Sequence, residues 1–192
     1  IDVGYHGGSI DGIVAGEAYV HNNTLTDTGH AVDDKRYGIA AIRAGGGNSV
    51  TAYNSLRACR HQGIVGGGSK ISNEIYSHGV EPKSIMIAAS DGDHVAGNRL
   101  SGCGCTAIAG TGGSRICDNT IYLQPAASGD AATGYSDITG IEVDMRGHAG
   151  SDTVCTGNTV VLDADNSCRM ARGVWLHDMD SASSINIHDN HI

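Results

Sequence analysis

The chain has 192 residues, of which 29 are glycine, two are proline and none is phenylalanine, and its net charge is −9. Abundant glycine without a Gly-X-Y period excludes collagen, and a hydrophobic fraction of 40% excludes simple disorder. The sequence has no run of Lys or Arg of the kind that attracts nucleic acid, and no apolar run reaches the ~20 residues of a membrane-spanning helix. We therefore expect one domain over residues 1–192, with no nucleic-acid partner and no membrane insertion.

One short motif, Asn-x-(Leu/Ile/Val), recurs along the whole chain. Its asparagines are Asn23, Asn54, Asn73, Asn98, Asn119, Asn158 and Asn190. The spacing between successive asparagines varies from 19 to 39 residues. Irregular spacing around a constant motif is typical of a solenoid whose structural unit carries loops of variable length.

A second motif, a short apolar segment opened in most copies by glycine, precedes each asparagine. Its copies begin at Gly12, Gly38, Gly63, Ser84, Ala107, Gly140 and Gly173. Alternation of inward and outward residues is clearest in the last two copies, GIEVDMRG and GVWLHDMD. No segment has a sustained helical period with caps, so we expect an all-β chain.

In chain order, the two motifs together predict the successive coils of a solenoid. These coils lie near residues 10–27, 38–59, 63–76, 84–101, 106–123, 140–162 and 173–192. The chain starts at Ile1 without a methionine and stops at Ile192 in the middle of the pattern. We therefore expect it to be a fragment of a longer chain.

Stacking explains why the motifs recur. One coil cannot bury its own apolar face, but stacked coils pair as parallel strands about 4.8 Å apart and enclose a continuous column of Ile, Val and Leu. An asparagine at the same turn of every coil can hydrogen-bond the asparagines above and below, which satisfies backbone groups that the bend leaves unpaired. We predict a single-stranded parallel β-helix of about seven coils with an asparagine ladder.

This pattern resembles the right-handed parallel β-helix of the pectin-lyase-like superfamily over nearly the whole chain. The resemblance implies a relative of polysaccharide lyases, glycoside hydrolases, epimerases, phage tailspike depolymerases or non-catalytic members. Tailspike members are homotrimers, so the resemblance also implies a homotrimer and an extracellular or virion-associated location. The Arg/Lys-centred patterns of pectate lyases are not found in this sequence.

Alternation assigns the side chains of the first strand of each coil to the inside or the outside. The expected inward row is Ile13, Ile39, Ile64, Ile85, Ile108, Ile141 and Val174. The expected outward rows are Val14, Ala40, Val65, Met86, Ala109, Glu142 and Trp175, then Gly16, Ile42, Gly67, Ala88, Thr111, Asp144 and His177. The first five coils thus expose a small, mostly apolar strip, which a neighbouring copy in a trimer can cover.

The last two coils replace this strip with residues that can carry chemistry. Glu142 and Asp144 lie two apart on one strand, so their Cα atoms are expected about 6.5 Å apart on the same face. Side chains at that spacing can reach the carboxylate separations of glycosidases. We predict that Glu142 is a general acid, Asp144 a base or nucleophile, and His177 a proton shuttle.

Three neighbouring residues are candidate substrate-binding groups. Trp175 offers a flat apolar face to a sugar ring. Arg146 can hold Asp144 in its charged form or bind an acidic sugar. Asp178 follows His177 directly and is the third candidate.

The expected function is that of a carbohydrate-active module that binds a polysaccharide and depolymerises it by glycosidic hydrolysis. Two alternatives stay open: a non-catalytic structural or adhesive rod, in which the charged strand face is only solvated, and a polysaccharide lyase or epimerase. No cofactor and no metal ligands are predicted. The six cysteines follow no disulfide or zinc spacing, and a calcium site at the Asp91-Gly92-Asp93 turn has little support because that sequence is common in turns.

Overall fold

The computed structural model describes residues 12–26, 40–59, 62–77, 84–103, 105–125, 136–165, 168–179 and 183–192. Within these ranges the chain forms strands β1 to β20 and no helix. The described residues therefore include no helix that is long and apolar enough to cross a membrane. The expectation of an all-β chain is confirmed for this part of the sequence.

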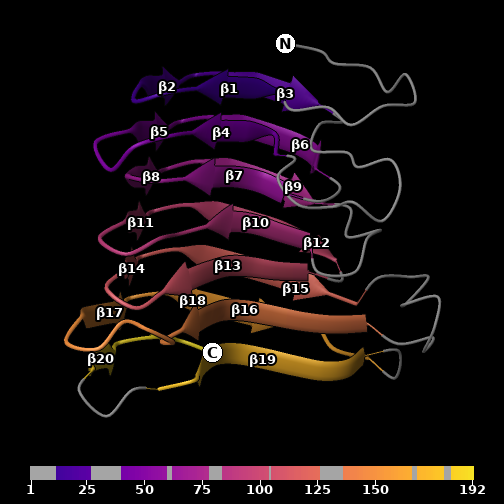
Figure 1. Ribbon diagram of the computed structural model, residues 1–192. Helices are drawn as coiled ribbons and strands as arrows, with labels where there is room; N and C mark the ends of the chain where they lie inside the picture. The colour runs from indigo at the N-terminus through magenta and orange to yellow at the C-terminus, as the bar shows by residue number, and fades with distance from the viewer. Residues whose placement is uncertain are drawn as a thin grey trace.

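The first sheet runs along the whole length of the fold, and all its neighbouring strands are parallel (Figure 1). Its strands, in spatial order, are β1 (Ile13–Ala15), β4 (Ile42–Ala44), β7 (Gln62–Gly66), β10 (Ser84–Ala88), β13 (Cys105–Thr111), β16 (Ser136–Asp144) and β19 (Cys168–His177).

The second sheet takes the next strand of each repeat, in the same spatial order. Its strands are β2 (Tyr19–His21), β5 (Val50–Ala52), β8 (Ser69–Ile71), β11 (His94–Ala96), β14 (Arg115–Cys117), β17 (Asp152–Thr156) and β20 (Ser184–His188).

The third sheet follows the same sequence of repeats. Its strands are β3 (Thr24–Thr26), β6 (Ser55–Cys59), β9 (Glu74–Ser77), β12 (Arg99–Cys103), β15 (Thr120–Gln124) and β18 (Thr159–Leu162). Three parallel sheets built from every third strand are consistent with a parallel β-helix. The handedness and the number of complete coils stay predictions.

The core lies between the three sheets and consists of columns of like side chains in register. On the third sheet the buried column is Leu25, Leu56, Ile75, Leu100, Ile121 and Val160. On the first sheet the inward column is Ile13, Ile42, Ile64, Ile87, Ile108, Ile141 and Val174. Each repeat therefore buries apolar side chains that it could not bury alone.

The asparagine ladder is confirmed between all seven predicted asparagines. In each neighbouring pair, the backbone N–H and the side-chain Nδ2 of one asparagine donate to Oδ1 of the next, with distances between 2.9 and 3.1 Å. The Nδ2 groups also donate to backbone carbonyls at the same bend, as Asn98 does to Lys70 and Ala96. The ladder therefore satisfies backbone groups at the bend between the second and third sheets.

The residue before each ladder asparagine has a left-handed backbone conformation. These residues are Asn22, Tyr53, Ser72, Gly97, Asp118, Gly157 and Asp189, with φ between 53° and 67°. Only two of the seven are glycine, although a side chain disfavours this conformation. The bend thus has the same backbone geometry in every repeat, whatever residue occupies it.

The predicted inward and outward rows of the first sheet differ from the structure in three repeats, one of which contains β7, where Val65, expected outside, is buried. Ile42, expected outside, is buried in the inward column, and Ala40 is buried too; Ile39 lies outside the described residues. In β10 the inward residue is Ile87 instead of Ile85, and Met86, expected outside, is buried. Met86 and Ile87 are consecutive buried residues, so β10 does not alternate strictly between buried and exposed side chains.

A buried ion pair, which the sequence pattern did not predict, lies inside the fold. Lys70 and Asp93 have side chains that are 1% and 3% exposed, and Lys70 Nζ bonds to Asp93 Oδ2. Lys70 Nζ also donates to the carbonyls of Gly66 and Gly68, while Asp93 accepts the backbone N–H groups of Gly68 and Ser90, both at 2.6 Å. The Asp93 carboxylate of the Asp91-Gly92-Asp93 turn therefore bonds to Lys70 and to backbone N–H groups inside the fold, which is a structural role.

The exposed apolar side chains do not lie where the trimer prediction placed them. Of the expected apolar strip on the first sheet, Val14 is 64% exposed, but Val65 is only 8% exposed. The third sheet instead exposes Tyr76, Tyr122 and Val161, which share one column. A homotrimer stays a prediction.

Candidate functional site

The predicted site residues gather on two neighbouring strands at one end of the first sheet, β16 and β19 (Figure 1). Glu142 pairs with Trp175 and Asp144 with His177, as the alignment of the last two repeats predicted. Glu142 and Asp144 alternate with the buried residues Val143 and Met145, so both face outwards. The sheet register therefore brings residues more than 30 positions apart in the sequence onto one surface.

His177 is the centre of the cluster. Its Nε2 lies 3.1 Å from Glu142 Oε1, and its Nδ1 lies 3.0 Å from Asp178 Oδ2. The side chain is only 20% exposed. Although His177 pairs with Asp144 in backbone register, its ring thus bonds to Glu142 and Asp178.

Desolvation and the neighbouring carboxylates act on His177 in opposite directions. Partial burial opposes its positive charge, but hydrogen bonds with Asp178 and Glu142 and the charges of Asp144 and Glu142 outweigh this effect. The pKa of His177 is therefore raised above its usual value. A histidine of this kind can hold and pass on a proton near neutral pH.

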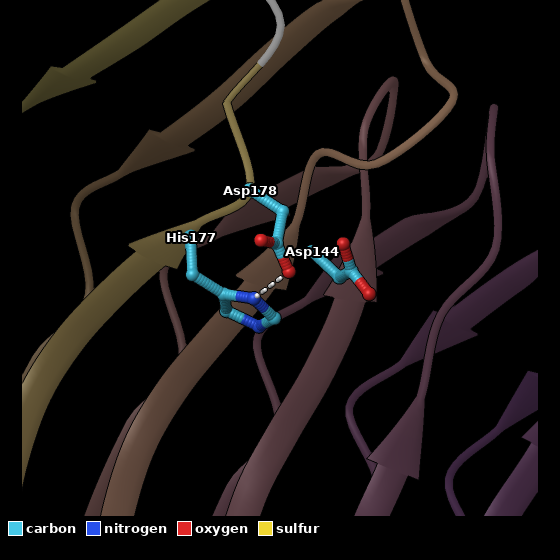
Figure 2. Close-up of side chains that lie close together, drawn as sticks. All are labelled: Asp144, His177 and Asp178. Atoms are coloured by element: carbon cyan, nitrogen blue, oxygen red, sulfur yellow. Dashed lines mark hydrogen bonds and ion pairs between the residues drawn. The ribbon is translucent and has the colours of Figure 1, made fainter.

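Asp178 and Arg146 form the outer part of the cluster (Figure 2 shows Asp178 beside His177 and Asp144). Arg146 Nη2 bonds to Asp178 Oδ2 and lies 3.9 Å from Asp144 Oδ2. The hydrogen bonds from Arg146 and His177 lower the pKa of Asp178. Asp178 has a left-handed backbone with φ of 53°, which turns the chain directly after β19.

Asp144 is oriented by the backbone of its own strand end. The backbone N–H of Arg146 donates to Asp144 Oδ1 at 2.9 Å. This local bond leaves Oδ2 on the side of the cluster that holds the Arg146 guanidinium. The predicted proximity of Arg146 to Asp144 is therefore present, although Arg146 contacts Asp178 more closely.

Trp175 is packed against charged and aromatic neighbours. The Arg172 guanidinium carbon lies 3.7 Å from the centre of the indole ring, a cation–π contact. The His177 ring stacks against Trp175 with centroids 4.4 Å apart and planes 29° apart. The contact between Arg172 and Trp175 was not predicted from the sequence, because strict alternation places residues three apart in a strand on opposite faces of the sheet.

The chemistry available in this cluster is proton transfer and binding of polar or cationic groups. Three carboxylates, those of Glu142, Asp144 and Asp178, share one imidazole and one guanidinium. Glu142 and His177 are both partly shielded from water, with side chains 27% and 20% exposed. Asp144 and Asp178 lie closer to solvent, where they can meet a ligand.

No family model, no curated protein and no solved structure matches this chain.

Proposed function

We propose that this chain is a carbohydrate-active module that binds a polysaccharide on the outward face of β16 and β19 and cleaves it by hydrolysis. The observation that carries the proposal is the pair of outward carboxylates, Glu142 and Asp144, next to a partly buried histidine and an indole ring. A pair of carboxylates, one acting as general acid and the other as base or nucleophile, is the usual catalytic pair of a glycosidase. We further propose an extracellular or virion-associated location, where such polymers occur.

In this mechanism Glu142 delivers a proton to the oxygen of the departing sugar. His177, hydrogen-bonded to Glu142 at 3.1 Å, replaces that proton on Glu142 and regains one from solvent before the next cycle. Asp144 either removes a proton from the attacking water, or attacks the sugar carbon itself to form a glycosyl ester, which a water molecule deprotonated by Glu142 then cleaves to release the sugar and free Asp144. Arg146 and Asp178 bind sugar hydroxyl or carboxylate groups at the edge of the site.

A digestion assay tests this proposal directly. The purified chain is incubated with a panel of polysaccharides, and the product masses are read by mass spectrometry. Hydrolysis gives shortened oligosaccharides that each contain one added water, whereas a lyase gives a new double bond that absorbs in the ultraviolet. Glu142→Gln and Asp144→Asn should each lower the rate by about 10²–10⁴-fold, the usual contribution of an acid or base.

The matched control is Asp163→Asn. Asp163 is an exposed carboxylate that accepts a hydrogen bond from Tyr122 at the third sheet, outside the cluster. Its replacement should leave the digestion rate unchanged. Unchanged digestion by the Glu142 and Asp144 variants would refute the assignment of the catalytic pair.

A non-catalytic rod is the second candidate, and one observation favours it. The polar side chains of the cluster bond mainly to one another, as an ordinary network on a solvated sheet surface also does. A rod predicts binding without any change in polymer length, and it predicts that Glu142→Gln leaves the binding affinity unchanged. The digestion assay separates these two outcomes.

A further inference from the structure

We propose that Asp144, His177 and Asp178 bind a divalent first-row transition metal ion, with Glu142 holding the histidine ring in place. One ligand atom from each of the three residues lies within 4.8 Å of the other two. Figure 2 shows the three side chains close together on the same surface, at the ends of β16 and β19. The proposal stands on donor atoms and charge, and it does not depend on the polysaccharide proposal.

The hydrogen-bonding capacity of His177 gives the first argument. Both ring nitrogens face carboxylate oxygens, Nε2 towards Glu142 at 3.1 Å and Nδ1 towards Asp178 at 3.0 Å. A neutral imidazole has one N–H, so it can donate to only one of the two. The other ring nitrogen then has a lone pair beside a carboxylate oxygen, which places two ligand atoms of a metal ion next to each other.

The position of Glu142 decides which nitrogen would bind the metal. Histidines that bind metals nearly always donate their other N–H to a carboxylate, a carbonyl or water, which fixes the ring orientation. Glu142 is placed to accept such a bond from Nε2. Nδ1 then faces Asp178, with Asp144 on the neighbouring strand as the third ligand.

The charge of the cluster gives the second argument. Glu142, Asp144 and Asp178 carry three negative charges, and among the described residues Arg146 carries the one permanent positive charge that contacts them. The three carboxylates exceed this permanent positive charge by two, an excess that a divalent ion neutralises. Arg146 competes for the same oxygens, but its side chain is 72% exposed and can turn into solvent.

The donor set indicates the class of metal. One imidazole nitrogen and two carboxylate oxygens suit Zn²⁺ or Mn²⁺, whereas Ca²⁺ and Mg²⁺ prefer sites made of oxygen alone. Three protein ligands would leave a coordination position open to water or to another molecule. Cys155 is a weak competitor for the metal, because burial raises its pKa to about 11 and a thiol must lose its proton to bind a metal.

The test is a calorimetric titration of the reduced full chain with Zn²⁺, with no polysaccharide present. We expect one Zn²⁺ per chain that the His177→Gln variant does not bind, so thiol sites cancel in the difference between the two titrations. Glu142→Gln should weaken binding by about 10–100-fold through loss of ring orientation. Arg146→Ala should tighten it about thirtyfold, the effect of one unit charge on a doubly charged ion at ~4 Å in water.

Two further measurements make the test specific. Asp163→Asn should bind like the unmodified chain, and the ¹⁵N resonance of His177 Nδ1, but not that of Nε2, should show the large shift of a metal-bound nitrogen. The proposal is overturned if His177→Gln binds Zn²⁺ as well as the unmodified chain does, or if Ca²⁺ binds equally well. A metal ion on Asp144 and His177 would occupy the groups that the hydrolysis proposal uses as base and proton shuttle, so digestion is measured separately in the presence of a chelator, and the two proposals can fail independently.

Discussion

Replacing Asn98 with alanine should destabilise the fold far more than the same change at the end of the ladder. Asn98 Oδ1 accepts two hydrogen bonds from Asn73, and Asn98 Nδ2 donates to Asn119, Lys70 and Ala96. Asn98 is completely buried. The truncation leaves two N–H groups of Asn73 without a partner and without access to water: its backbone N–H and one of the two on Nδ2, whose other hydrogen still bonds to the Thr51 carbonyl.

The magnitude follows from these two orphaned donors. An unsatisfied buried polar group costs about 1–3 kcal/mol, so Asn98→Ala should lower the free energy of unfolding by about 2–6 kcal/mol. A domain of this size loses about 2–4 °C of Tm for each kcal/mol. A loss of about 3 kcal/mol therefore lowers Tm by about 6–12 °C.

The assay is thermal unfolding followed by circular dichroism, with Asn23→Ala as the matched control. Asn23 donates to Asn54 and to the His21 carbonyl, and no described residue donates to its side chain. Its loss should cost under about 1 kcal/mol. Asn98→Asp is a second variant, which keeps the acceptor but removes the donors, and it should also destabilise. Equal changes in Tm for Asn98→Ala and Asn23→Ala would refute the reasoning.

Three other predictions concern single positions of the fold. Lys70→Met should cost about 3–5 kcal/mol because it leaves Asp93 charged and buried, and a double variant with Asp93→Leu should recover much of that loss; denaturant titration measures both. Gly66→Ala should prevent normal folding, because the added Cβ would lie 1.7 Å from the Ala44 carbonyl oxygen. Gly92→Ala places its Cβ in open space and should cost only about 1 kcal/mol, from its positive φ. Soluble yield and Tm distinguish the two variants. Tyr53→Val should lower stability by about 1–2 kcal/mol relative to Tyr53→Asn, because asparagine tolerates the left-handed backbone better than a β-branched residue; equal Tm values would contradict this.

The sequence was sufficient to predict the ladder and the partners of the last two strands. Both depend on residues that occupy equivalent places in successive repeats, so aligning the repeats also aligns them in space. The same alignment failed at Ile42 and Ile87, because local breaks in alternation leave no trace in a pattern of apolar residues. Periodicity gives the backbone register but not the point at which a strand bends.

Side-chain partners were harder to predict than strand partners. Lys70 and Asp93 are 23 residues apart and belong to no repeated motif, so nothing in the pattern connected them. Backbone register placed His177 beside Asp144, but the direction of the ring depends on which carboxylates it can reach, and it bonds to Glu142 and Asp178. Such contacts depend on rotamers and local charge, which alternation does not encode.

Because the backbone has the same bend before each ladder asparagine, one whole repeat, called a cassette below, can be removed and the flanking repeats joined at equivalent positions. Asn98 and Asn119 are 21 residues apart, and each is preceded by the same left-handed backbone. Deleting residues 98–118 would join Gly97 to Asn119 and remove one strand from each sheet. Asn119 would then take the place of Asn98 next to Asn73 in the ladder. In the first sheet, Ile141 would take the place of Ile108 next to Ile87. The length of the rod can therefore change by whole cassettes while the pitch, set by the hydrogen bonds between asparagines, stays the same.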